Sequence, residues 1–299
     1  MAKTKEISRR IKSIASTKKI TKAMEMVAAA KMRKATEAVL KTRTYANLSW
    51  ETILNLSKLA QSKNQELHPL LSKREDVKRV AVILITSNRG LCGGFNAAII
   101  NKVKDSIKKH SFPTDLILVG KKGAILHHQG YEVAAEFPKS DLVINSSETN
   151  PIALLAIADF LNGKYDRVML AYTDFVSPVK QVPRLKQLLP VEIEMENNQV
   201  GSITDVKAPT ENIVSDYTFE PSPEEVLNLM VPKLIEVQLY QALLETNAAE
   251  HSARMTSMHQ ATEAATDMVN ELTLFYNKAR QASITAEIAE ISAGANALN

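Results

Sequence analysis

Glycine and proline are concentrated in the middle of this 299-residue sequence, and that distribution restricts the possible folds more than any other feature. Both residues interrupt helices, because glycine adds backbone freedom and proline lacks the amide donor that a helix interior needs. The first 68 residues contain neither, the last proline is Pro232, and no glycine lies between Gly201 and Gly294. The sequence therefore predicts a long helix at each end and a domain with turns between them.

The composition agrees with long helices. Aromatic residues make up only 5% of a chain that is 45% hydrophobic, which favours helices rich in small aliphatic side chains over one bulky core. No stretch reaches the roughly 20 uninterrupted apolar residues that cross a bilayer, so we expect no membrane span. A single cysteine, Cys92, excludes an internal disulfide and agrees with a reducing compartment.

The C-terminal helix has a clear start and a regular apolar pattern. Ser222 is a candidate N-cap, Pro223 suits the first helical position, and Glu225 completes a capping box. Steps of three, four and seven residues then predict the seam of a coiled coil, and Pro232 predicts a local kink. The predicted seam residues are Val226, Met230, Leu234, Val237, Leu244, His251, Met255, Met258, Ala265, Leu272, Ala279 and Ala286.

The N-terminal segment carries a narrower apolar stripe. Its predicted seam residues are Ile7, Ile11, Ile14, Ile20, Met24 and Val27. A narrow stripe cannot stabilise a lone helix in water, so we expect the two terminal helices to bury their seams against each other. Because one helix enters the middle domain and the other leaves it, the predicted coiled coil is antiparallel.

The middle of the chain alternates short apolar runs with helical stretches. Strands are predicted at 79–86, 115–119 and 166–172, and helices at 96–110, 121–129 and 151–161. Buried strands alternating with helices are typical of an α/β fold with a mainly parallel sheet, here a Rossmann-like domain. The predicted boundaries are 1–68 for the N-terminal coiled-coil helix, 77–200 for the central domain and 222–293 for the C-terminal coiled-coil helix.

A glycine-rich turn follows the first strand, where a Rossmann domain would hold a dinucleotide. Its glycines, at 90, 93 and 94, have the spacing G-x-x-G-G instead of G-x-G-x-x-G, and no acidic residue ends the second strand. We interpret the turn as tight packing between strand and helix, with a nucleotide-dependent enzyme as the alternative. His127 and His128 are predicted to be solvated, and Cys92 buried, so we expect no catalytic, metal or cofactor site.

The first 43 residues hold 13 basic and three acidic residues. Such an excess indicates an acidic partner, although a nucleic-acid arm or a targeting segment are alternatives. The first aromatic residue is Tyr45, so stacking on bases is not expected, and Glu6 and Glu25 argue against a targeting segment. We favour a helix that faces partner proteins and binds no nucleic acid.

Three segments resemble the gamma-subunit family of F-type ATP synthases. Residues 19–33 (KITKAMEMVAAAKMR) and 276–287 (YNKARQASITAE) are similar to its two terminal signatures. Residues 87–94 (SNRGLCGG) match a third, with Asn88 in place of an acidic residue. The resemblance implies a non-catalytic central rotor shaft that couples ion-driven rotation to ATP synthesis or hydrolysis. The implied partners are the alpha and beta subunits of the hexameric head, the epsilon subunit and the membrane c-ring.

The resemblance also implies which residues of the shaft meet the head. The implied contacts with beta subunits are Lys22, Met24, Arg280, Gln281, Thr285 and Glu287. We expect Ile288 and Ile291, in a tip with few charges, to form a smooth apolar bearing. The resemblance further implies a location on the cytoplasmic face of the bacterial plasma membrane, attached through the complex.

Overall fold

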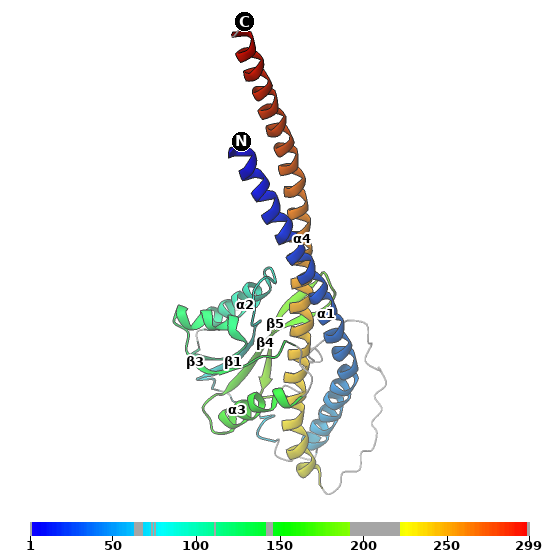
Figure 1. Ribbon diagram of the computed structural model, residues 1–299. Coiled ribbons are helices and arrows are strands. Elements are labelled where there is room, and N and C mark those ends of the chain that lie inside the picture. The colour runs from blue at the N-terminus through cyan, green and yellow to red at the C-terminus, as the bar shows by residue number, and fades with distance from the viewer. Residues whose placement is uncertain are drawn as a thin grey trace. The chain divides into compact units, whose positions relative to one another are not determined.

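A computed structural model describes residues 2–62, 68–72, 74, 76–110, 112–141, 146–191 and 222–297. The chain divides into two compact units (Figure 1). The shaft unit comprises Met1–Ala28 and Arg254–Asn299, and the body unit comprises Ala29–Ala253. The helices α1, Ala2–Ser62, and α4, Pro223–Ala297, each contribute to both units. The domain boundaries 1–68, 77–200 and 222–293 remain a prediction, since 63–67 and 192–221 lie outside the described residues.

The body contains a five-stranded sheet with the order β3-β2-β1-β4-β5. Its strands are β1 (Val80–Ile85), β2 (Thr114–Val119), β3 (Val133–Phe137), β4 (Arg167–Phe175) and β5 (Gln181–Leu189). The first four are parallel, and β5 is antiparallel to β4. The predicted Rossmann-like sheet of mainly parallel strands is thereby confirmed.

Two of these strands were not predicted from the sequence. β3 and β5 are the edge strands, and an edge strand lacks the continuous apolar run that identified the three central ones. The sequence of β5, QVPRLKQLL, contains Pro183 and four polar or charged residues before its apolar end. Proline is tolerated at an edge because the missing amide faces no further strand.

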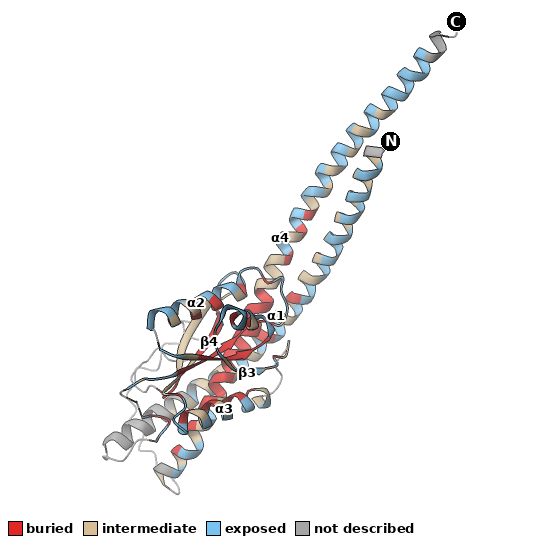
Figure 2. Ribbon diagram, turned by 90° about the vertical axis from the view of Figure 1, so that its left-hand side faces the viewer, coloured by how far each residue is buried: buried red, intermediate tan, exposed pale blue. Residues whose placement is uncertain are grey.

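Helices cover both faces of the sheet. On one face, α2 (Phe95–His110) packs on alternate residues of β1 and β2, including Val82, Leu84 and Leu116. On the other face, α3 (Asn150–Leu161) and parts of α1 and α4 pack on Ile83 and Ile117. Figure 2 shows this burial along the body part of α4. Because both faces are covered, β1 is apolar at every position, and β2 and β4 each contain a continuous apolar run.

The predicted helix at 121–129 is a 3-10 helix, η1, Lys121–Gln129. It ends at Gly130, which adopts the left-handed conformation with φ of 85°. A second short 3-10 helix, η2, spans Ser146–Glu148. The predicted start of α4 is confirmed, because the hydroxyl of Ser222 accepts a hydrogen bond of 3.3 Å from the amide of Glu225. The helix continues through Pro232.

The expectation of tight packing at the glycine-rich turn is wrong for two of its three glycines. A side chain added at Gly90 or Gly94 would meet nothing within 4 Å. The backbone at Gly93 is left-handed, with φ of 57°, which favours glycine, although Leu91 in the same turn adopts φ of 62°. The steric requirement for glycine is at Gly120. At Gly120 φ is 93° and an added Cβ would lie 2.3 Å from the carbonyl oxygen of Thr86. The tight approach is therefore between the ends of β1 and β2.

Candidate partner-contact surface

In the shaft unit, α1 and α4 form an antiparallel pair. The hydroxyl of Thr262 donates to that of Thr21 at 2.8 Å, and His259 lies 3.3 Å from the carboxylate of Glu25. Increasing numbers on one helix thus meet decreasing numbers on the other. On α4, the predicted seam is confirmed from Met255 to Ala279, whose members are buried or half-buried. Ala286 is exposed, so its predicted place in the seam is wrong.

The seam of α1 differs from the prediction in its second half. Ile7, Ile11 and Ile14 are half-buried, as predicted, but Ile20 and Val27 are 61% and 57% exposed. A strict heptad continued from Ile14 leads through Lys18, Thr21, Glu25 and Ala28, and these four positions are the less exposed ones. The prediction assigned apolar residues to the seam, whereas polar residues occupy three of these four seam positions.

Seven of the eight predicted contact residues are exposed. Lys22 pairs with Glu25 at 3.0 Å, and this hydrogen bond holds the pKa of the Glu25 carboxyl below its usual value. Met24 is the exception, since it is half-buried. The remaining six exposed residues all lie on α4: Arg280, Gln281, Thr285, Glu287, Ile288 and Ile291.

The six exposed residues on α4 share one broad face. At about 100° per residue they fall within one half of the helix circumference, turned away from the seam. The antiparallel register places the start of α1 opposite about residue 281 of α4. Beyond that level every described side chain of α4 except that of Ser283 is exposed, including Ile284, Ile288 and Ile291 (Figure 2). The tip is thus a single helix with uncovered apolar side chains.

The basic residues at the start of α1 are also uncovered. Lys5, Arg9, Lys12 and Lys19 are exposed and form no ion pair with any residue that the structure describes. A face with several uncompensated cations attracts acidic surfaces. Ile20 and Val27 add two apolar side chains to the exposed face of the same helix, and sequence reasoning missed both as contact candidates.

The body holds its part of α4 by buried polar contacts that the sequence did not predict. Glu245 is fully buried and accepts hydrogen bonds from Arg43 of α1 at 2.8 Å and from the amide of Phe175 in β4 at 3.1 Å. Burial raises the pKa of the Glu245 carboxyl, against the effect of Arg43. Next to it, Thr42 donates to Gln241 at 2.8 Å. Glu245 therefore joins both long helices to the sheet.

A second group of contacts joins α4 to the segment after β3. Lys139 and Glu250 form an ion pair in which both side chains are almost completely buried. His251 contacts the carbonyl oxygen of Asp141 at 2.8 Å, and the Asp141 carboxylate accepts from Lys31 of α1 at 3.0 Å. We call the residues Lys31, Arg43, Lys139, Asp141, Glu245 and Glu250 the polar clamp. Apolar packing keeps a helix on its sheet but allows it to slide along the sheet. Hydrogen bonds and ion pairs are directional, so they also fix the register and rotation of the helix.

The remaining predictions concern sites of other kinds. Cys92 is buried and His127 and His128 are exposed, as predicted. In the glycine-rich turn, the amide and hydroxyl of Ser87 are already bonded to the side chain of Asn96, at 3.0 and 2.7 Å. Among the described residues no group of acidic, histidine or cysteine side chains could hold a metal ion, and no helix could span a membrane.

Comparison with known proteins decides between the remaining interpretations. A family model described as ATP synthase matches residues 3–298. The chain is 44% identical to the ATP synthase gamma chain of Heliobacterium modesticaldum, over 98% of both chains, and 42% identical to that of Pelotomaculum thermopropionicum, over the full length of both. The chain belongs to the ATP synthase gamma chain family. The family resemblance read from residues 19–33, 87–94 and 276–287 is therefore confirmed.

Solved structures agree with the gamma chain fold. The chain is similar to a protein in the central stalk and c-ring structure of the Tetrahymena thermophila mitochondrial ATP synthase. The TM-score is 0.60 at 24% identity, over 81% of this chain and 99% of that one. A chain in the Euglena gracilis mitochondrial enzyme gives a TM-score of 0.64 at 17% identity, over 99% and 95%. As a gamma chain, the protein is a non-catalytic part of a membrane-associated complex.

Proposed function

We propose that this chain is the central rotor shaft of an F-type ATP synthase on the cytoplasmic face of the bacterial plasma membrane. In this role the body unit takes up the rotation of the membrane c-ring, together with the epsilon subunit. The shaft unit turns inside the hexamer of alpha and beta subunits. The observation that carries this proposal is the single-helix tip of α4, whose exposed apolar side chains need a partner to cover them.

Rotation acts on catalysis through differential contact. The shaft presents uncompensated cations on α1 and a mixed apolar and polar face on α4, so its surface differs around its circumference. A beta subunit that meets one face is stabilised in a different conformation from one that meets another. Turning the shaft therefore shifts the population of nucleotide-binding states in each beta subunit in sequence.

The contact residues divide into two kinds by their chemistry. Arg280 and Lys22 offer donors to carboxylates on beta, and Arg280 can hold one in a bidentate pair. Gln281, Thr285 and Glu287 provide hydrogen-bonding groups on the same broad face of α4 as Arg280, and Met24 is half-buried on α1. Ile288 and Ile291 form the bearing, where an apolar contact without directional bonds lets the tip turn in its sleeve.

Replacing Ile288 and Ile291 together by aspartate tests the bearing. We expect the variant complex to assemble and its coupled ATP synthesis in reconstituted membranes to fall, because two carboxylates would have to lose their hydration inside an apolar sleeve. The control replaces both residues by leucine, which keeps the apolar surface and should keep the synthesis rate. Unchanged synthesis in the aspartate variant would count against the bearing. Failure of the parent chain to assemble with its cognate alpha and beta subunits would refute the proposed function itself.

A further inference from the structure

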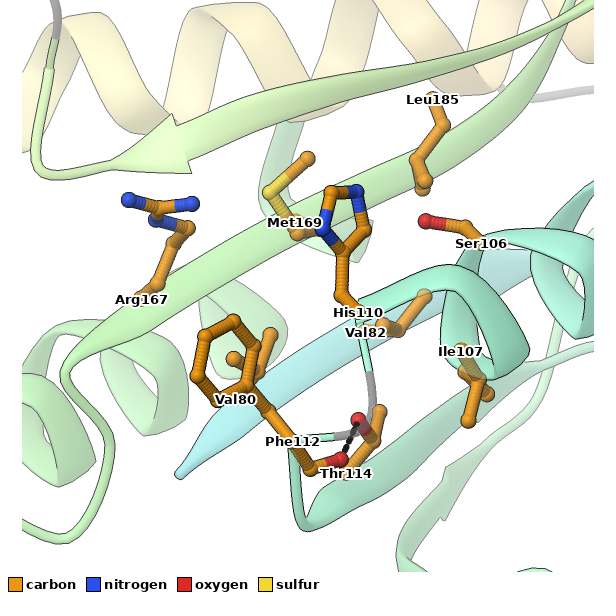
Figure 3. Close-up of a pocket in the computed structure, with 10 residues that line it drawn as sticks. All are labelled: Val80, Val82, Ser106, Ile107, His110, Phe112, Thr114, Arg167, Met169 and Leu185. Carbon is orange, nitrogen blue, oxygen red and sulfur yellow. Dashed lines mark hydrogen bonds between the residues drawn. The ribbon is translucent and has the colours of Figure 1, made fainter. Parts of the chain in front are cut away.

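A pocket lies in the body unit between the end of α2 and the beginnings of β1, β2 and β4 (Figure 3). Its cavity volume is about 70 Å³, and it opens to solvent. Its floor is formed by Val80, Val82, Met169 and Leu185, which belong to the sheet face that α2 covers. The pocket is separate from the polar clamp, since the clamp contacts the opposite face of the sheet.

Two polar side chains, those of Arg167 and His110, lie next to this apolar floor. Arg167 projects from β4 and His110 from the end of α2, and in Figure 3 Met169 lies between them. Arg167 forms no hydrogen bond or ion pair with any described residue. The ring of His110 stacks on that of Phe112, with centroids 6.5 Å apart. No carboxylate is among the residues that line the pocket.

The acidic residue next to Arg167 in the sequence is engaged by another cation. Asp166, its neighbour in the sequence, already pairs with Arg74 at 2.9 Å and accepts from the backbone amides of Lys78 and Arg79. The last turn of α2 adds Lys108 and Lys109 on the exposed side. The pocket itself therefore holds one cation, Arg167, beside an apolar floor, a combination that complements an anion with a hydrocarbon tail.

Size and position exclude a nucleotide. Sites for ligands of that size have volumes of roughly 300–1,000 Å³, several times the volume here. Dinucleotides also bind at the carboxyl ends of parallel strands, whereas this pocket lies where the strands begin. A space of this volume accepts a few methylene groups.

We propose that the pocket binds medium-chain aliphatic carboxylates, with the carboxylate at Arg167 and His110 and the hydrocarbon tail on the floor. The guanidinium of Arg167 donates to the carboxylate, and the His110 ring contributes a further N–H donor. The tail displaces water from Val80, Met169 and Leu185, so the two ends of the ligand are recognised by different forces.

Calorimetric titration of the full-length chain with hexanoate, octanoate and octan-1-ol tests this proposal. We expect saturable binding of octanoate and an affinity for hexanoate within about fourfold of it, because the pocket accepts only a few methylene groups of either tail. Octan-1-ol, which has the same tail without the charge, should bind more weakly than octanoate. Absence of saturable octanoate binding, or equal affinity for octan-1-ol, would overturn the proposal.

Two variants locate the binding site. Arg167→Met should weaken octanoate binding by about fivefold, the upper range for one partly exposed ion pair. Ser106→Phe, which fills the pocket from α2, should abolish binding. The control Lys180→Met removes a cation from the turn at the other end of β4 and should leave the affinity unchanged. Thermal melting verifies that each variant is folded, and unchanged affinity in both folded pocket variants would place any binding elsewhere.

Discussion

Replacing Lys139 by methionine tests the polar clamp most directly. Lys139 and Glu250 form an ion pair in which the side chains are 1% and 3% exposed. Methionine keeps most of the volume of lysine but removes the charge. The Glu250 carboxylate would then remain buried and lose its ion pair with Lys139.

The magnitude follows from the cost of a buried charge. Removing one partner of a buried ion pair lowers the free energy of unfolding by about 3–5 kcal/mol, because the other charge stays desolvated. For a body unit of this size, 1 kcal/mol shifts the melting temperature by about 2–4 °C, so we expect a decrease on the order of 10 °C. The double variant Lys139→Met/Glu250→Met should lose less free energy of unfolding than either single variant, since both charges of the pair are removed.

Urea unfolding of the four proteins, parent, two single variants and double variant, gives the coupling energy of the pair. The control is Lys41→Met, which removes an ion pair with Glu37 whose side chains are 73% and 65% exposed. That change should leave the unfolding midpoint nearly unchanged. The reasoning is refuted if Lys139→Met costs no more than the control, or if the double variant loses the sum of the two single losses.

Two further predictions concern the body unit. Gly120→Ala should lower the free energy of unfolding by about 2–4 kcal/mol, because φ is 93° and the new Cβ would lie 2.3 Å from the Thr86 carbonyl oxygen. Gly130→Ala, where φ is 85° but the surrounding space is open, should lower it by only about 1–2 kcal/mol in the same urea assay. The hydrogen bond from Lys31 holds the pKa of the Asp141 carboxyl below its usual value. A lowered folded-state pKa means that this stabilisation is present above about pH 4 and is lost as the pH falls through the folded pKa. Lys31→Met should therefore lower the urea midpoint at pH 7 but much less at pH 2, and an equal loss at both values would contradict the assigned pairing.

Local signals in the sequence were sufficient where the structure depends on neighbours along the chain. The absence of helix breakers predicted α1 and α4, the hydroxyl of Ser222 predicted the start of α4, and continuous apolar runs predicted β1, β2 and β4. In each case the relevant spacing is within one or two turns or within a single strand. The edge strands β3 and β5 lack such a run, because each pairs with a neighbouring strand on one side only and is less completely buried.

The contact surface was predicted less completely than the fold. Lys22, Met24, Arg280, Gln281, Thr285 and Glu287 were selected by resemblance, and Ile288 and Ile291 by the low charge of the tip. The structure places all of these residues except Met24 at the surface. Ile20 and Val27 were assigned to the wrong side of α1, because an apolar side chain at the surface gives the same local pattern as one in a seam. The contacts of Thr21 with Thr262 and of Glu25 with His259 fix which side of α1 faces α4.

The sequence by itself determined that this protein has two long terminal helices around a mainly parallel α/β sheet, because those features follow from backbone freedom and apolar periodicity. The tertiary structure alone decided that the stretch of α4 containing Glu245 and Glu250 is buried. From sequence alone, charged residues are expected at the surface, because they are rarely fully buried unless they are paired. Their burial here depends on Arg43 and Lys139, which lie more than 100 residues away and come within bonding distance only in the folded chain.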